Sequence, residues 1–210
     1  MTVTNKPAIY LYQNDLPDNI SLGNVVAVDT ETLGLNPKRD RLCLVQLSSG
    51  DGNAHLVKFA PGPITAPNLK KVLSDPRVTK IFHFARFDLA ALQQHLGIMA
   101  TPVYCTKVAS RIARTFTQHH SLKTLCKDLL NIELDKQQQT TDWGAATLTP
   151  EQLAYAASDV LHLHALKDAL DQVLKREGRD ALAKSCFEFL PTRALLDLHG
   201  WPEEDIFAHH

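Results

Sequence analysis

The sequence contains no apolar run near the ~18 residues that a membrane-spanning helix requires. Its N-terminus, MTVTNKPAIY, lacks the pattern of a signal peptide. The four cysteines are widely spaced and form no CxxC pair, so neither a zinc site nor a disulfide framework is expected. Together these absences predict a cytoplasmic protein with reduced thiols and no membrane partner.

Dense blocks of positive charge are also missing. The 22 Lys and Arg residues are balanced by 23 Asp and Glu residues, which gives a net charge of -1. Proteins that bind a long nucleic-acid backbone usually carry a strongly basic face. A nucleic acid bound by this chain would therefore be short, or the basic groove local. No Gly-rich turn follows the apolar strand at 25–28, which excludes a dinucleotide-binding Rossmann domain.

What the sequence does contain suits one domain. Its length is 210 residues and 44% of them are hydrophobic, enough for a sizeable core. Turn signals separate three short apolar segments, which predicts a meander of strands before any helix. The expected strands are 25–28, 42–47, 54–59 and 80–84, and the expected helices are 67–73, 86–96, 106–113 and 121–130. This order predicts an α/β fold whose sheet is only partly parallel.

The clearest helix signal lies at Thr149. Thr149 at N-cap, Pro150 at the first helical position and Gln152 two residues later form a capping box. We expect this helix to run to about Glu177. The segment beyond it, about 180–210, is too apolar for a solvated tail, so it is expected to pack on the domain or on a neighbouring subunit.

Two acids end the most apolar strand, in VVAVDTETLGL. Asp29 and Glu31 alternate along a strand and therefore point to one face. Two carboxylates at a buried strand end repel each other, and a divalent cation with hard oxygen ligands, Mg²⁺ or Mn²⁺, relieves that repulsion. The alternative is a solvent-facing strand end with ordinary acids.

Two further acidic motifs follow. Asp88, in KIFHFARFDLAAL, sits in the first turn of a predicted helix, where a charge that stabilises the helix dipole is the alternative role. Tyr155 and Asp159, in YAASDVLHL, are four residues apart and share a helix face. Their alternative is a hydrogen bond between the phenol and the carboxylate.

The ordered set Asp-x-Glu, Asp and Tyr-x-x-x-Asp resembles the DEDD superfamily of 3′–5′ exonucleases, in the subgroup whose last motif carries Tyr. The resemblance implies an RNase H-like (DnaQ-like exonuclease) fold, with a mixed five-stranded sheet flanked by helices. It implies that two divalent cations, Mg²⁺ or Mn²⁺, are held by four carboxylates. These are Asp29, Glu31, Asp88 and Asp159. Tyr155 would position the attacking water, and the two cations would offset the charge of the phosphodiester.

A narrower resemblance covers nearly the whole chain. The segments RDRLCLVQLSSGDG, TKIFHFARFDLA, CTKVASRIARTFT and GWPEEDIFAH resemble the nanoRNase C family within the ribonuclease D-like exonucleases. That family degrades dinucleotides and very short RNAs and assembles as a homo-octamer, so the resemblance implies both for this chain. Three substrate contacts are hypotheses: Leu35 as an apolar wedge between two bases, His83 at a base or phosphate, and Lys136 at a phosphate. A loop leucine in the core and a structural histidine are the alternatives.

Three other functions remain open at this point. The chain could trim longer RNA 3′ ends as ribonuclease D does, although only about 35 residues follow the catalytic region, too few for the helical module of that enzyme. It could degrade DNA, because no motif separates RNA from DNA. It could also be a silent nucleic-acid-binding module. The complete set of acids and Tyr155 argues against the silent module.

Overall fold

The computed structural model describes residues 7–134 and 141–209. Its sheet has six strands in the order β1-β4-β3-β2-β5-β6. The strands are β1 (Ile9–Gln13), β2 (Val25–Thr32), β3 (Leu42–Ser48), β4 (Ala54–Lys58), β5 (Thr79–Phe82) and β6 (Val103–Cys105). The helices are α1 (Pro67–Ser74), α2 (Ala85–Leu96), α3 (Thr106–Ala113), α4 (Leu122–Leu130), α5 (Pro150–Leu161), α6 (Leu163–Arg176) and α7 (Asp180–His199).

The sheet is mixed, as the sequence predicts. The pairs β2–β3 and β3–β4 are antiparallel and form the expected meander, whereas β1–β4, β2–β5 and β5–β6 are parallel. The expectation of five strands was wrong. The two edge strands, β1 and β6, went unrecognised because one is largely exposed and the other has only 3 residues.

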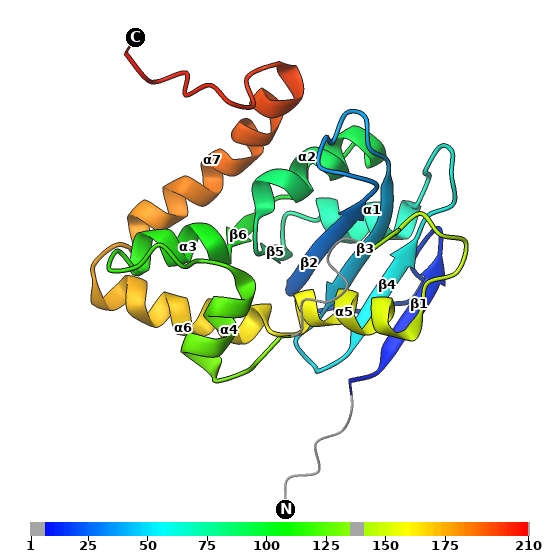
Figure 1. Cartoon of the computed structure of the whole chain (residues 1–210), viewed down its shortest axis with the longest axis horizontal. Coiled ribbons are helices and arrows are strands. Elements are labelled where there is room, and N and C mark those ends of the chain that lie inside the picture. Colours follow the sequence, from blue (N-terminus) through cyan, green and yellow to red (C-terminus); the bar gives the residue numbers. More distant parts are fainter. Residues whose placement is uncertain (1–6, 135–140, 210) are drawn as a thin grey trace, which may run out of the picture.

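Helices cover both faces of the sheet. In Figure 1, α5 lies across one face, over β3 and β4, while α1 and α2 lie behind the sheet. The central strand β3 is buried at every residue, which requires cover on both sides. The remaining helices gather beside β5 and β6, where α3 packs on α6 and α7 packs on α2.

The long helix expected from Thr149 to about Glu177 is interrupted at His162. The capping box of Thr149 and Gln152 is formed as predicted, but α5 ends at Leu161 and α6 begins at Leu163. The interruption lets α5 contact the strands while α6 contacts α3 and α4. Hydrophobic spacing alone did not reveal it, because both helices bury apolar residues.

The last helix, α7, leads into an extended segment with several exposed apolar side chains. Phe189 and Phe207 contact each other there, with ring centroids 5.9 Å apart. Across residues 7–134 and 141–209, no helix combines the length and hydropathy that a bilayer crossing requires. The four cysteines are free thiols, and Cys43, Cys105 and Cys126 are buried.

Candidate active site

Strand β2 carries the first two acids at the centre of the sheet. It lies between β3 and β5 and continues through Asp29 and Glu31 to Thr32, four residues beyond the predicted end. The pairing with β3 shifts register between Glu31 and Thr32. Such irregularities often redirect side chains next to active sites. The backbone of Asp29 and Glu31 is therefore fixed by pairing with β3, since β5 pairs only with Val25, Val26 and Ala27.

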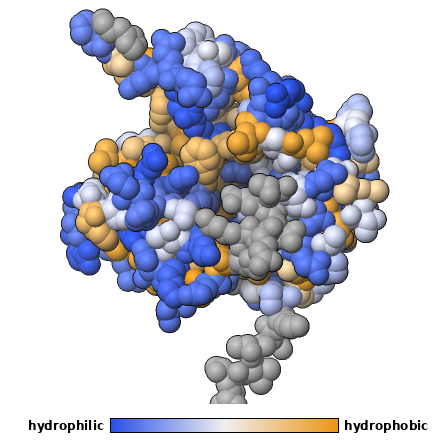
Figure 2. Space-filling model, in the orientation of Figure 1, coloured by the Kyte–Doolittle hydropathy of each residue, from blue (hydrophilic) through white to orange (hydrophobic). Residues whose placement is uncertain are grey.

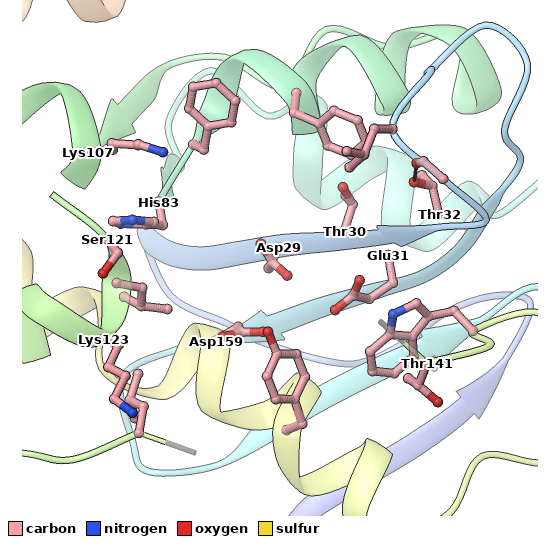
Figure 3. A pocket seen from close by; sticks show the side chains of 18 of the residues that line it. Asp29, Thr30, Glu31, Thr32, His83, Lys107, Ser121, Lys123, Thr141 and Asp159 are labelled. Carbon is pink, nitrogen blue, oxygen red and sulfur yellow. Dashed lines mark hydrogen bonds between the residues drawn. The ribbon is translucent and has the colours of Figure 1, made fainter. Parts of the chain in front are cut away.

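Helix α5 brings the last acid over these two. One carboxylate oxygen each from Asp29, Glu31 and Asp159 lies within 4.8 Å of the other two. Figure 3 shows Asp29 and Glu31 pointing from β2 toward Asp159 on α5. The spacing of acids along the strand and the capped helix thus bring three of the four predicted metal ligands together.

Asp88 lies beside this group rather than within it. It is 3% exposed in the first turn of α2, and Thr30 Oγ1 donates a hydrogen bond of 2.7 Å to its Oδ1. The first turn is also the position at which a carboxylate stabilises the helix dipole, which was the alternative role. Thr30 lies between Asp29 and Glu31 on β2. The strand that presents these two acids therefore also holds the carboxylate of Asp88, which comes from α2.

The four carboxyl groups repel one another in a buried site. Burial raises the pKa of Asp29, Glu31, Asp88 and Asp159. The charge of Asp29 raises the pKa of Glu31, Asp88 and Asp159 further. Oxygen ligands, high negative charge and close spacing are the conditions that a hard divalent cation satisfies. The residues therefore fit the predicted metal, which would keep the carboxylates ionised.

Tyr155 lies on the same helix face as Asp159, as predicted. Burial, followed by the charge of Asp159, raises the pKa of the Tyr155 phenol. Its ring contacts Trp143 with centroids 6.2 Å apart. The hydroxyl therefore stays protonated at neutral pH and can donate a hydrogen bond toward the carboxylates.

Asp29, Glu31, Tyr155 and Asp159 line one cavity of about 650 Å³, whereas Asp88 lies outside its lining. Figure 3 shows Lys107, Ser121 and Lys123 at one end, Glu31 and Thr141 at the other, and Asp29 and Asp159 between them. Figure 2 shows a hollow in the middle of this face, with hydrophobic side chains gathered on its rim. The volume lies within the ~300–1,000 Å³ typical of small-ligand sites.

The three predicted substrate contacts differ in position. Leu35 is 88% exposed at the cavity, which excludes the alternative that it packs in the core. His83 also lines the cavity; its Nδ1 lies 2.9 Å from Thr106 Oγ1, and burial lowers its pKa to about 3. Lys136 lies outside the described residues.

Other residues of the site were not predicted. Gln46 Nε2 donates a hydrogen bond of 3.3 Å to Asp29 Oδ2 from the paired position on β3. A lone glutamine within the apolar segment LCLVQL was the signal that could have identified it. Phe84 lines the cavity beneath Lys107, whose Nζ lies 4.5 Å from the ring centroid. No pattern in the sequence marked Lys107 or Lys123, because only folding brings them to the cavity.

Comparison with known proteins identifies the class. A family model described as 3′-5′ exonuclease matches residues 13–175. Ribonuclease D of Gluconacetobacter diazotrophicus is 37% identical over 154 residues, which cover 73% of this chain and 39% of that protein. DNA polymerase I of Aquifex aeolicus is 32% identical over 159 residues, which cover 26% of that protein. The chain spans only 38% to 45% of the length of three ribonuclease D proteins that it matches. The chain therefore belongs to the 3′–5′ exonuclease family.

Comparison with solved structures identifies a narrower family. Brucella melitensis NrnC bound to pGG has a TM-score of 0.93 and 54% identity, covering 97% of this chain and 100% of that chain. Brucella melitensis NrnC with bound Mg²⁺ has a TM-score of 0.92 and 54% identity over the same shares. Escherichia coli RNase D has a TM-score of 0.72 and 25% identity, covering 81% of this chain and 45% of that chain. The chain belongs to the NrnC (nanoRNase C) family of DnaQ-like 3′–5′ exonucleases.

Proposed function

We propose that this enzyme hydrolyses 5′-phosphorylated dinucleotides and other very short RNAs from the 3′ end, using two divalent cations. The observation that carries the proposal is the charge distribution in the cavity. Buried carboxylates lie at its centre, and Lys107 and Lys123 lie at one end. A short substrate would place its scissile phosphodiester at the carboxylates and a terminal phosphate at the lysines.

The comparison structures support the same substrate class. Brucella melitensis NrnC, 54% identical, has been solved with pGG, a 5′-phosphorylated dinucleotide. The same protein has been solved with Mg²⁺. The net charge of -1 also suits a substrate with few phosphates better than a long backbone.

Each side chain has a distinct part in the proposed reaction. Asp29, Glu31, Asp88 and Asp159 would hold the cations, which lower the pKa of bound water and stabilise the leaving oxygen. Gln46 orients Asp29, and Thr30 orients Asp88. The protonated Tyr155 hydroxyl would orient the attacking water through a hydrogen bond.

Side chains on the rim of the cavity would position the substrate. Leu35, 88% exposed, would act as the wedge between two bases. Phe84, 45% exposed, offers a ring for stacking with a base. His83 remains a proposed contact to a base or phosphate, and its Nε2 is buried without a hydrogen-bond partner among the described residues. Lys136 remains a proposed phosphate contact.

The decisive experiment compares substrate lengths. Turnover of 5′-phosphorylated RNAs of about two, three, five and twenty nucleotides is measured with Mg²⁺ or Mn²⁺ and with EDTA. Faster hydrolysis of the dinucleotide than of the long RNA supports the proposal. Equal or faster loss of the long RNA favours ribonuclease D-like trimming, and matched deoxyribonucleotides test DNA cleavage. Absence of metal-dependent turnover on every substrate would favour a silent binding module.

We also propose a homo-oligomer, an octamer as in the family resemblance, formed by a single cytoplasmic domain. Its support is a set of exposed apolar side chains on α7 and the segment after it. These are Leu182, Phe189, Leu195, Trp201, Ile206 and Phe207. Light scattering at micromolar concentration tests the assembly, and a monomer there would rule it out.

A further inference from the structure

The first turn of α2 forms part of the substrate cavity but lacks a local side-chain cap. Phe84 occupies its N-cap position without a side-chain hydrogen bond, and Phe84 and Phe87 both line the cavity. Uncapped helix ends lose the stabilisation that a capping side chain gives to the free N–H groups. Something other than a cap must fix this turn.

An ion pair on the opposite side of the turn provides that restraint. Arg86 Nε donates to Asp197 Oδ2 at 2.6 Å, and Arg86 Nη2 donates to Asp197 Oδ1 at 2.8 Å. The two side chains are 33% and 12% exposed. Bidentate pairs of this kind fix orientation as well as distance. Arg86 thus joins the turn that carries Phe84 and Phe87 to α7.

Asp197 also holds a second arginine. Arg193 Nη2 donates to Asp197 Oδ1 at 2.7 Å. Both guanidinium groups also donate hydrogen bonds to backbone carbonyl oxygens of the C-terminal segment. Arg86 donates to Pro202, and Arg193 donates to Trp201 and Glu204. One carboxylate therefore compensates two positive charges and links α2, α7 and the segment after it.

We infer that Asp197 is a positioning residue for substrate binding, acting through Arg86 on the first turn of α2. The inference rests on the proposed function, because Phe84 and Phe87 matter only if the cavity binds the substrate. Asp88 lies in the same turn, but Thr30 Oγ1 holds its carboxylate independently from β2. Loss of the ion pair therefore displaces the two phenylalanines while the metal ligands stay in place.

The test measures kcat and KM separately for pGG with Mg²⁺ in Arg86→Gln, Asp197→Asn and the double variant. We expect KM to rise about ten-fold in each single variant, with kcat and the Mg²⁺ dependence unchanged. The double variant shows no further rise, because both changes break one link. Asp197→Glu, which keeps the charge, restores part of the affinity. Arg77→Gln is the control, since Arg77 pairs with Asp75 on the surface with its side chain 85% exposed.

Arg86→Gln leaves the Arg193–Asp197 pair on α7 intact but also removes the Arg86–Pro202 contact, so light scattering on each variant checks that its assembly matches the wild type. Unchanged KM in Arg86→Gln overturns the inference, whatever Asp197→Asn does. A lower melting temperature and a lower kcat at unchanged KM would mean a purely structural ion pair and also overturn it. If the wild type does not hydrolyse pGG, the proposed function fails, and KM is measured on the chain length that does turn over.

Discussion

At the scale of single residues, a carboxylate buried in a sheet destabilises the fold unless a cation or a donor compensates its charge. Asp29 accepts from Gln46 Nε2 at 3.3 Å and from the backbone of Thr30, which is too little for a group surrounded by three other acids. Selection for catalysis rather than for stability explains such a cluster. Stability and activity should therefore change in opposite directions when one acid is neutralised.

Asp29→Asn tests this opposition. We expect turnover to fall about 10³-fold or more, because a metal ligand that supplies several kcal/mol to the transition state is lost. Without metal, the free energy of unfolding should rise by about 1–3 kcal/mol as repulsion is relieved. Turnover assays and urea unfolding in EDTA measure the two effects. Asp168→Asn, at an exposed position of α6, is the control. Retention of a tenth of the activity would show that Asp29 is not a ligand.

Tyr155→Phe separates the hydroxyl from the ring. The variant keeps the ring beside Trp143 but cannot donate a hydrogen bond. We expect kcat to fall about 10²-fold, the scale of a lost proton-positioning group, with little change in KM or in Mg²⁺ dependence. Steady-state kinetics check this, with Tyr10→Phe on the edge strand as a matched control. An unchanged kcat would assign Tyr155 a packing role alone.

Local patterns predicted the residues that share one element. Asp29 with Glu31, and Tyr155 with Asp159, follow from the periods of a strand and a helix. Thr30 and Lys107 could not be found this way, and Gln46 was marked only by its place within an apolar segment. The roles of Gln46 and Thr30 depend on strand pairing and helix packing, which join residues 17 and 58 positions apart in Gln46–Asp29 and Thr30–Asp88.

At the scale of elements, the start of α5 is fixed by its own sequence. Thr149 Oγ1 accepts from Gln152 N at 3.2 Å, and Gln152 Oε1 accepts from Thr149 N at 2.8 Å. Gln152 Nε2 also donates to Thr141 Oγ1 at 2.7 Å. The capping box therefore places both Asp159 and the segment that carries Trp143.

Thr149→Ala should lower the free energy of unfolding by about 1 kcal/mol, the usual effect of losing an N-cap side chain. Since Gln152 still contacts Thr141, kcat should change little. Urea unfolding measures the change in the free energy of unfolding, and steady-state kinetics measure kcat. Thr147→Ala, at an exposed position just before the helix, is the control. Equal stability of the two variants would mean that packing rather than capping fixes the start of α5.

Helix periodicity and turn residues correctly predicted the elements in the interior of the fold. The elements that were missed have weaker local signals. The predicted 106–113 helix agrees with α3, and the turn signals gave the β2–β3–β4 meander. The interruption at His162 carries no Gly or Pro, and the edge strands β1 and β6 have only 5 and 3 residues. Tertiary contacts decide such places, and sequence periodicity does not report them.

At the scale of the whole molecule, a bound cation would join β2 and α5 through the carboxylates of Asp29, Glu31 and Asp159. Mg²⁺ at about 100 times its Kd should stabilise the fold by about 2.7 kcal/mol. For a chain of this size, that raises Tm by about 5–10 °C. Thermal unfolding in Mg²⁺ and in EDTA checks this. Asp159→Asn should show a smaller shift, and an equal shift would place the cation elsewhere.

The acids that make up the site come from β2, α2 and α5, so Asp29 and Asp159 are separated by most of the chain. A nascent chain that has not yet delivered α5 has no group of three carboxylates and no Tyr155. Neither does a molecule whose α5 has detached from the sheet. If these residues form the active site as proposed, the exonuclease can cut only once α5 has docked on the sheet, and a copy without that contact would leave nucleic acid intact.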